Sequence, residues 1–267
     1  MCTSPSECRK AALRAAEKGI EYLRKSFLKE ELTNVVEDHK TDVSRKVDLE
    51  VEDIIIRTLR EEGFKGSIVT EEKGVVGDGE DHAIIDPLDG SLDFSVGMPY
   101  FIVSVAIAKG ETLRDVVAGA LCPSFGHPCY SFDDRGVYEG DLPLKRGKRE
   151  KVMIFYGDPE SKQLEFLKRS HELLGRPKIR TPGAIAFDLL HLVRGKVLAV
   201  IDIRNKLRNV DIASAIPMYL RVGGNVNEDV LDTKVDSVRV AGDIIALDDE
   251  EKFKELIQAR AALLGRR

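Results

Sequence analysis

The stretch Ala83 to Phe94, AIIDPLDGSLDF, decides how this chain is interpreted. Asp86, Asp89 and Asp93 crowd into eight positions directly after an apolar run. An apolar run of this kind predicts a buried strand, and strand ends are where a fold gathers side chains into a cleft. Ionised carboxylates in one cleft repel each other and raise each other's pKa unless cations offset them. The crowding therefore raises the question of a metal site.

The turn inside this stretch suits such a site. Pro87 fixes its own backbone angle and has no N–H, so the carbonyl of Leu88 can face a metal ion. Gly90 lets the backbone pass close to a ligand. Ser91 is predicted to be the N-cap of a short helix that runs into Phe94, and the amides at such a helix start can bind an anion.

The same letters also suit an ordinary turn, with Asp as the cap and Gly as the terminator. This segment alone therefore leaves turn and metal site open. Two other sites fit poorly. The ligand spacing does not follow the D-x-D-x-D-G of an EF-hand. A phosphatase with an aspartyl nucleophile needs D-x-D, and D-x-x-D is one residue too long.

Further acidic residues follow other predicted elements. Glu71 and Glu72 end the strand SIVTEE, and Asp211 begins a helix after a polar turn. If these residues converge with Asp86 and Asp89, the natural counterions are hard divalent cations. Mg²⁺ usually lies among carboxylates, waters and substrate phosphate.

Composition bounds the class of protein. Of the 267 residues, 43% are hydrophobic and 33% charged, and the net charge is −5. This balance is typical of a soluble globular protein and gives no general attraction for nucleic acid or anionic membrane. No apolar stretch reaches membrane-spanning length and no signal-peptide pattern begins the chain. We expect a cytoplasmic protein with a small-molecule substrate and no nucleic-acid or membrane partner.

The chain has four cysteines, Cys2, Cys8, Cys122 and Cys129. None forms a C-x-x-C pair and the spacings match no zinc site. Free buried or surface thiols are the favoured interpretation, and a disulfide within either pair stays an alternative.

Hydrophobic periodicity predicts an α+β fold. Short turns between the strands of residues 100–140 indicate an antiparallel meander, and helices alternate with strands after residue 150. We expect two α+β layers sharing one core, with parts 1–148 and 149–267 forming one catalytic unit and a boundary near 145–152. Residues 73–81 are predicted to form a Gly-rich flap. Helices are predicted at 5–32, 44–62, 161–174, 184–194, 211–222 and 249–264, and strands at 67–72, 82–86, 151–157, 178–181, 197–203, 237–240 and 244–247.

Three segments together resemble the inositol monophosphatase family of magnesium-dependent phosphatases. They are VTEEKG (69–74), IIDPLDGSLDF (84–94) and NVDIASA (209–215). The family carries G-E-E, then D-P-[IL]-D-G-[ST], then W-D-x-A, in this order and at this spacing. The chain is most similar to the archaeal type, inositol-1-phosphatase and class IV fructose-1,6-bisphosphatase. The resemblance implies a layered α-β-α-β-α sandwich, two or three Mg²⁺ ions per active site and a homodimer.

Four positions depart from the family pattern. Thr70 replaces the Gly of G-E-E and Val210 replaces the Trp of W-D, which we interpret as packing changes. Ser91 replaces Thr and keeps the hydroxyl. Asp93 replaces the usual Asn and adds a charge near the site.

The resemblance implies a role for each metal ligand. Glu71, Asp86 and the Leu88 carbonyl would hold one Mg²⁺, and Asp86, Asp89 and Asp211 a second. A third, weaker ion would lie near Glu71 and Asp48. The nucleophile would be a water activated by metal, with Asp48, Glu71 and Ser91 orienting it or taking its proton. Asp48 alone also suits ordinary helix-dipole chemistry, because it lies in a first helical turn.

The resemblance also implies a substrate surface. Asp89, Gly90 and Ser91 would meet the scissile phosphate. The segment after Pro182-Gly183 would present the amides of Ala184 and Ile185 to sugar hydroxyls. Arg180 and Arg204 are candidate substrate contacts. Animal-type relatives usually carry Glu at the position of Arg204, and Arg there would favour a bisphosphate, since Arg binds phosphate bidentately.

A lone Arg is also commonly just a solvated side chain. Lys40 and Asp42 fall in the loop that the family uses as a mobile lid, and simple surface charge is favoured for Lys40.

The predicted function is Mg²⁺-dependent hydrolysis of a sugar or inositol phosphate, such as fructose 1,6-bisphosphate or inositol 1-phosphate. One alternative is a phosphatase of 3′-phosphoadenosine 5′-phosphate or NADP, which needs an apolar or aromatic base pocket. Another is a non-catalytic, metal-binding regulatory protein that kept the fold.

Overall fold

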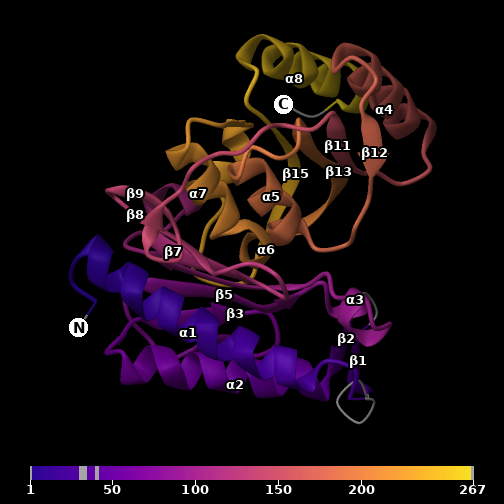
Figure 1. The fold of residues 1–267 in the computed structure, drawn as a ribbon. Helices are drawn as coiled ribbons and strands as arrows, with labels where there is room; N and C mark the ends of the chain where they lie inside the picture. Colours follow the sequence, from indigo (N-terminus) through magenta and orange to yellow (C-terminus); the bar gives the residue numbers. More distant parts are fainter. Residues whose placement is uncertain (1, 30–34, 40–41, 266–267) are drawn as a thin grey trace.

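The computed structural model describes residues 2–29, 35–39 and 42–265. Within them the chain forms five stacked layers, helix, sheet, helix, sheet, helix (Figure 1). The α-β-α-β-α sandwich predicted from the sequence is therefore confirmed. The helices are α1 (Pro5–Ser26), α2 (Lys46–Glu61), α3 (Ser91–Ser95), α4 (Ser161–Leu173), α5 (Ile185–Val193), α6 (Asn209–Ile212), α7 (Ala215–Arg221) and α8 (Glu250–Leu264).

The first sheet has eight strands in the order β10-β9-β8-β7-β6-β5-β3-β4. Strands β5 to β10 pair antiparallel with their neighbours, which confirms the predicted meander, and β3 pairs parallel with β5. The strands are β3 (Ser67–Thr70), β4 (Gly74–Val76), β5 (His82–Asp89), β6 (Ile102–Ala108), β7 (Val116–Pro123), β8 (Tyr130–Asp133), β9 (Gly136–Glu139) and β10 (Leu142–Pro143).

Strand β5 runs through Asp89 rather than ending at Asp86. Its register against β6 shifts between these two residues. Pro87 lies at this irregularity, where it has no N–H to give to the ladder. Asp86 and Asp89 thus both belong to one strand end, at the edge where the pocket lies.

The second sheet has five strands in the order β12-β11-β13-β15-β14. Strands β12, β11 and β13 are parallel, and β15 is antiparallel to β13 and β14. Strand β13 extends to Arg208, five residues beyond the predicted end, and the two short strands expected after residue 236 form one strand, β15. The strands are β11 (Val152–Tyr156), β12 (Lys178–Arg180), β13 (Ala199–Arg208), β14 (Asn225–Val226) and β15 (Val240–Leu247).

Three apolar clusters fill the spaces between layers, in place of the single shared core that we expected. One joins α1 and α2 to the first sheet, and the second joins α5 and α7 to both sheets. The third joins the second sheet to α4 and α8. Five layers leave four interfaces, so one continuous core cannot form. The helices α1 and α2 lie together on the outer face of the first sheet (Figure 1).

Several element boundaries differ from the prediction. Helix α1 ends at Ser26, and the expected polar loop contains a hairpin of β1 (Val35–His39) and β2 (Asp42–Arg45). Lys40 lies outside the described residues. The expected flap contains β4, paired with β3.

The helix predicted at 211–222 is split into α6 and α7. Pro217 is the third residue of α7, where its missing N–H has no intrahelical acceptor to lose.

The cysteines correct a second expectation. Cys2 is bonded to Cys8, and Cys122 to Cys129, so that no described cysteine is a free thiol. The two cysteines of each pair are only six or seven positions apart. The spacing rules for zinc sites and C-x-x-C redox motifs do not predict a disulfide at this separation.

The chain passes from the first sheet to the second between β10 and β11. The division into parts 1–148 and 149–267 that form one catalytic unit stays a prediction. None of the helices in the described part of the chain is both long and apolar enough to cross a membrane.

Candidate active site

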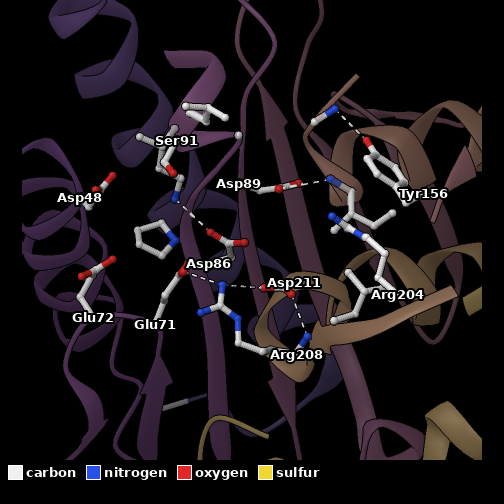
Figure 2. A pocket seen from close by; sticks show the side chains of 17 residues that line it. Asp48, Glu71, Glu72, Asp86, Asp89, Ser91, Tyr156, Arg204, Arg208 and Asp211 are labelled. Atoms are coloured by element: carbon white, nitrogen blue, oxygen red, sulfur yellow. Dashed lines mark hydrogen bonds and ion pairs between the residues drawn. The ribbon is translucent and has the colours of Figure 1, made fainter. Parts of the chain in front are cut away.

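A pocket of about 320 Å³ opens where the two sheets meet. One wall comes from α2, the turn after β3, β5 and the start of α3, and the other from β11, α5, β13 and α6. Figure 2 shows the labelled residues of both walls around the pocket. The structure brings ten of the eleven predicted site residues to this pocket. They are Asp48, Glu71, Asp86, Leu88, Asp89, Gly90, Ser91, Ile185, Arg204 and Asp211.

Arg180 is the predicted residue that does not line the pocket. It lies in β12, whose three residues are exposed, and its guanidinium donates to the carbonyl of Ile179. Asp42 lies in β2, and the structure gives no description of its side chain.

Asp86 is the most buried carboxylate of the pocket, with a relative exposure of 2%. Its Oδ1 accepts the amide N–H of Leu88 at 3.1 Å, which holds the turn around Pro87. Burial raises the pKa of Asp86 well above its ordinary value, and the charges of Glu71, Asp89 and Asp211 raise it further. The charged form of Asp86 is therefore destabilised in the pocket, and a bound cation would stabilise it.

Asp89 is held by the helix start of α5. Its two oxygens accept the amide N–H groups of Ile185 at 3.2 Å and Ala186 at 2.6 Å. The amides of Ala184 and Ile185 were expected to meet sugar hydroxyls. In the structure the amide of Ile185 instead binds Asp89, together with the amide of Ala186. Burial raises the pKa of Asp89 and the charge of Asp211 adds to this, while the two amides oppose it.

Arg208 lies between the acidic residues on the other side of the pocket (Figure 2). Its Nη2 is 2.5 Å from Oε1 of Glu71 and 3.3 Å from Oδ1 of Asp211, and its backbone N–H donates to Oδ2 of Asp211 at 2.7 Å. One guanidinium thus faces a group of four carboxylates that includes Asp86 and Asp89. The pocket keeps an excess of negative charge even with Arg208 in place.

The residues present fit divalent cations. The donors are carboxylates and the carbonyl of Leu88, all oxygen, which is the set that hard cations prefer. The raised pKa values of Asp86 and Asp89 mark charge that nothing in the described protein fully offsets. Among the described residues no three acidic, histidine or cysteine side chains already form a closed cage, and Arg208 lies between two of the candidate ligands.

Gly90, rather than Ser91, is the N-cap of α3. Gly90 has φ of +90°, and a Cβ there would lie 2.6 Å from the carbonyl oxygen of Tyr100. Only glycine suits this backbone, so Ser91 becomes the first residue of the helix and its side chain makes no cap. Ser91 lines the pocket beside Gly90.

Asp93 lies behind the pocket wall. It is buried, burial raises its pKa, and its Oδ2 has no hydrogen-bond partner in the described part of the chain. A Cβ on Gly183, a pocket residue, would lie 2.4 Å from this oxygen. The extra charge expected near the site is therefore packed against the substrate segment. The two other departures, Thr70 and Val210, are fully buried, as packing changes require.

Several pocket residues were not predicted, among them Tyr156 and Arg208. Tyr156 is the last residue of β11, where strand ends face a cleft, so its position was a usable signal. Arg208 precedes Asp211 by three residues, within reach on a helical turn. The contact of Arg208 with Glu71 joins residues 137 positions apart and had no local signal.

Carboxylates from both halves of the chain around one pocket are the arrangement of a metal-assisted hydrolase. The model of the inositol monophosphatase family matches residues 4–260. A curated protein of Thermococcus kodakarensis, named fructose-1,6-bisphosphatase/inositol-1-monophosphatase, is 32% identical over 239 residues, covering 85% of this chain and 86% of that protein. This chain belongs to the inositol monophosphatase family, a family of phosphoric monoester hydrolases.

Two further proteins are similar to this chain over most of its length. A solved structure from Pyrococcus horikoshii, described as a hypothetical protein with similarities to inositol-1-monophosphatase, superposes with a TM-score of 0.78 at 27% identity. It covers 96% of this chain and 99% of its own. A protein of Pseudomonas aeruginosa named Nus factor SuhB is 28% identical over 230 residues, covering 81% and 83% of the two chains.

Proposed function

We propose that this protein is an Mg²⁺-dependent phosphomonoesterase that releases phosphate from a sugar or inositol phosphate, fructose 1,6-bisphosphate and inositol 1-phosphate being the candidates. The observation that carries the proposal is the convergence of Glu71, Asp86, Asp89 and Asp211 on one pocket together with Ser91. These residues come from both halves of the chain, and their burial is hard to explain without cations.

Glu71, Asp86 and the Leu88 carbonyl would hold one Mg²⁺, and Asp86, Asp89 and Asp211 a second, with a third near Glu71 and Asp48. When bound, Mg²⁺ supplies Lewis-acid stabilisation of the phosphate charge and lowers the pKa of water. The chain's own residues would position the reactants around these ions.

Gly90 makes the turn at φ of +90° that packs against the carbonyl of Tyr100, and Asp89, Gly90 and Ser91 would together meet the scissile phosphate. The Ser91 hydroxyl would orient the attacking water, and the carboxylates of Asp48 and Glu71 would take its proton. The Ile185 and Ala186 amides keep Asp89 aimed at the pocket. Arg204 would bind a second phosphate of the substrate on the far side from Glu71 (Figure 2).

One observation favours the nucleotide alternative enough to test it. A cavity of about 440 Å³ adjoins the pocket through Tyr156 and Arg204, and Phe155, Leu164, Leu167 and Ile179 line it. Such a surface suits a base as well as it suits a sugar. A non-catalytic regulatory role, which the name of the Pseudomonas relative brings to mind, gains no support from a pocket that keeps all the expected carboxylates.

We further propose a cytoplasmic homodimer that acts on a small phosphorylated molecule and binds neither nucleic acid nor membrane. The support is the resemblance to the family for the dimer and the mildly acidic net charge of −5 for the absent partners.

The test is phosphate release from fructose 1,6-bisphosphate, inositol 1-phosphate and 3′-phosphoadenosine 5′-phosphate, each with Mg²⁺ and with a chelator. We expect Mg²⁺-dependent release from one or both of the first two. Preference for the nucleotide would replace the sugar assignment by the alternative. No release from any of them, with metal still bound, would favour the regulatory role. Asp236→Asn is the matched control, because Asp236 forms a surface ion pair with Arg239.

A further inference from the structure

Asp202 is a buried carboxylate that the proposed reaction does not use. It lies in β13 with a relative exposure of 0%. Its Oδ1 accepts the backbone N–H of Arg204 at 3.0 Å and Nε at 3.1 Å, and its Oδ2 accepts Nη2 at 2.5 Å. A carboxylate that binds one edge of a guanidinium through both of its oxygens fixes the plane of the whole group.

The face of the same guanidinium is held by an aromatic ring. The Arg204 guanidinium carbon lies 4.7 Å from the centre of the Tyr156 ring. Tyr156 is itself fixed, because its hydroxyl donates to Asp188 at 2.5 Å and accepts the amide N–H of Gly183 at 2.7 Å. Asp188 is fully buried and also accepts the hydroxyl of Tyr100 at 2.6 Å. The Arg204 guanidinium is therefore restrained along one edge by Asp202 and on one face by the Tyr156 ring.

The Arg204 guanidinium lies at the boundary between two cavities. Arg204 and Tyr156 line both the carboxylate pocket and the neighbouring 440 Å³ cavity. Figure 2 shows Arg204 beside Tyr156, on the side of Asp89 and away from Glu71. Within the described ranges Nη1 has no hydrogen-bond partner, while Nε and Nη2 are taken by Asp202. The edge that carries Nη1 is what the guanidinium can offer a ligand.

We propose that Asp202 is a positioning residue that selects bisphosphorylated substrates by holding Arg204 with its Nη1 edge toward the second phosphate. The inference rests on the proposed phosphatase function and deepens it. A free arginine side chain loses rotamer freedom when it binds an anion, whereas one already held by Asp202 and Tyr156 loses less. Because Asp202 offsets the charge of Arg204, recognition depends on direction more than on net charge.

The experiment is a double-mutant cycle of Asp202→Asn and Arg204→Ala, assayed with fructose 1,6-bisphosphate and with inositol 1-phosphate. We expect Asp202→Asn to raise KM for the bisphosphate about tenfold, the size that the loss of one charged hydrogen bond gives. Both kcat and the KM for the monophosphate should change less than about threefold, a range set by the factor-of-two-to-three scatter of weak contacts. In the Arg204→Ala background, Asp202→Asn should have no further effect.

Arg204→Lys tests orientation while Asp202 itself stays in place. It keeps the charge and loses the fork, so we expect the same rise in KM for the bisphosphate. Asp236→Asn is again the control for removing one carboxylate charge. Wild-type KM in Arg204→Lys, additive effects in the cycle, or equal losses on both substrates would overturn the inference.

Failure of the proposed function is a separate outcome. If the wild type binds the bisphosphate without hydrolysing it, the phosphatase proposal fails, and dissociation constants from calorimetry take the place of KM in the same cycle. If the wild type neither hydrolyses nor binds the bisphosphate, both proposals are wrong.

Discussion

At the scale of single residues, the site is dominated by carboxylates whose charged form the fold disfavours. Asp86 is almost fully buried among Glu71, Asp89 and Asp211, and its pKa is raised by burial first and by these charges second. Arg208 reduces the excess charge through Glu71 and Asp211. The same repulsion that destabilises the metal-free site gives a divalent cation its binding energy.

Asp86→Asn tests this balance. We expect phosphate release with Mg²⁺ to fall roughly 10²–10³-fold, the size of loss when a preorganised electrostatic partner of the transition state is removed. In chelator, the melting temperature should rise, because a buried charge is replaced by a neutral side chain of the same shape. Calorimetry in chelator and phosphate release with Mg²⁺ measure the two effects. A lower melting temperature in chelator would show that Asp86 is stabilising as a charge.

At the scale of elements, α2 is tied to the loop that carries the acidic pair after β3. Glu52 in α2 is fully buried, and its Oε1 accepts the backbone N–H of Lys73 at 3.1 Å. Asp48 lies one turn earlier in α2 and lines the pocket. Burial raises the pKa of Glu52 from 4.5 to about 7. The helix thus holds a carboxyl that prefers to be protonated near neutral pH.

Glu52→Gln should reveal that preference as a function of pH. Since the folded-state pKa of Glu52 exceeds the unfolded value, the wild type is favoured at low pH and loses stability as the pH rises from about 4.5 through 7. We expect the variant to match the wild type near pH 4.5 and to be more stable by about 3 kcal/mol at pH 8. Chemical unfolding across this range measures it, with Glu61→Gln, exposed on the same helix, as the control. A difference that does not vary with pH would exclude the buried charge as its cause.

At the scale of the whole molecule, the site joins the two sheets. Glu71 follows β3 and Asp86 and Asp89 lie at the end of β5 in the first sheet, whereas Asp211 lies in α6, directly after β13 of the second. The apolar cluster between the sheets brings these elements together. A cation bound by residues of both sheets would therefore stabilise the entire fold and not one half of it.

Added Mg²⁺ should raise the melting temperature of the wild type. At a hundred times the dissociation constant the gain is about 2.7 kcal/mol. Asp211→Asn should lose most of this gain while keeping a cooperative transition, because one ligand from the second sheet is removed. Differential scanning calorimetry with increasing Mg²⁺ gives the comparison. An undiminished shift in Asp211→Asn would place the cation elsewhere.

Much of the fold was predictable from local pattern. The antiparallel meander, the helices α4, α5 and α8 and the turn around Pro87 follow from periodicity and turn chemistry. The errors fall where neighbours in space decide the outcome. The 211–222 segment breaks at Ala213 and Ser214, β13 extends to Arg208 because β15 pairs with it that far, and Gly90 takes the cap that Ser91 was expected to make.

The site divides in the same way. The sequence by itself determined the family and the order of the acidic motifs, because the residues of each motif are neighbours along the chain. Only the tertiary structure decided their partners: the α5 amides on Asp89, 96 and 97 positions apart, and Arg208 on Glu71, 137 positions apart. It also decided which face of Arg204 meets the Tyr156 ring. These contacts depend on how the two sheets pack, and no local pattern in the chain encodes that packing.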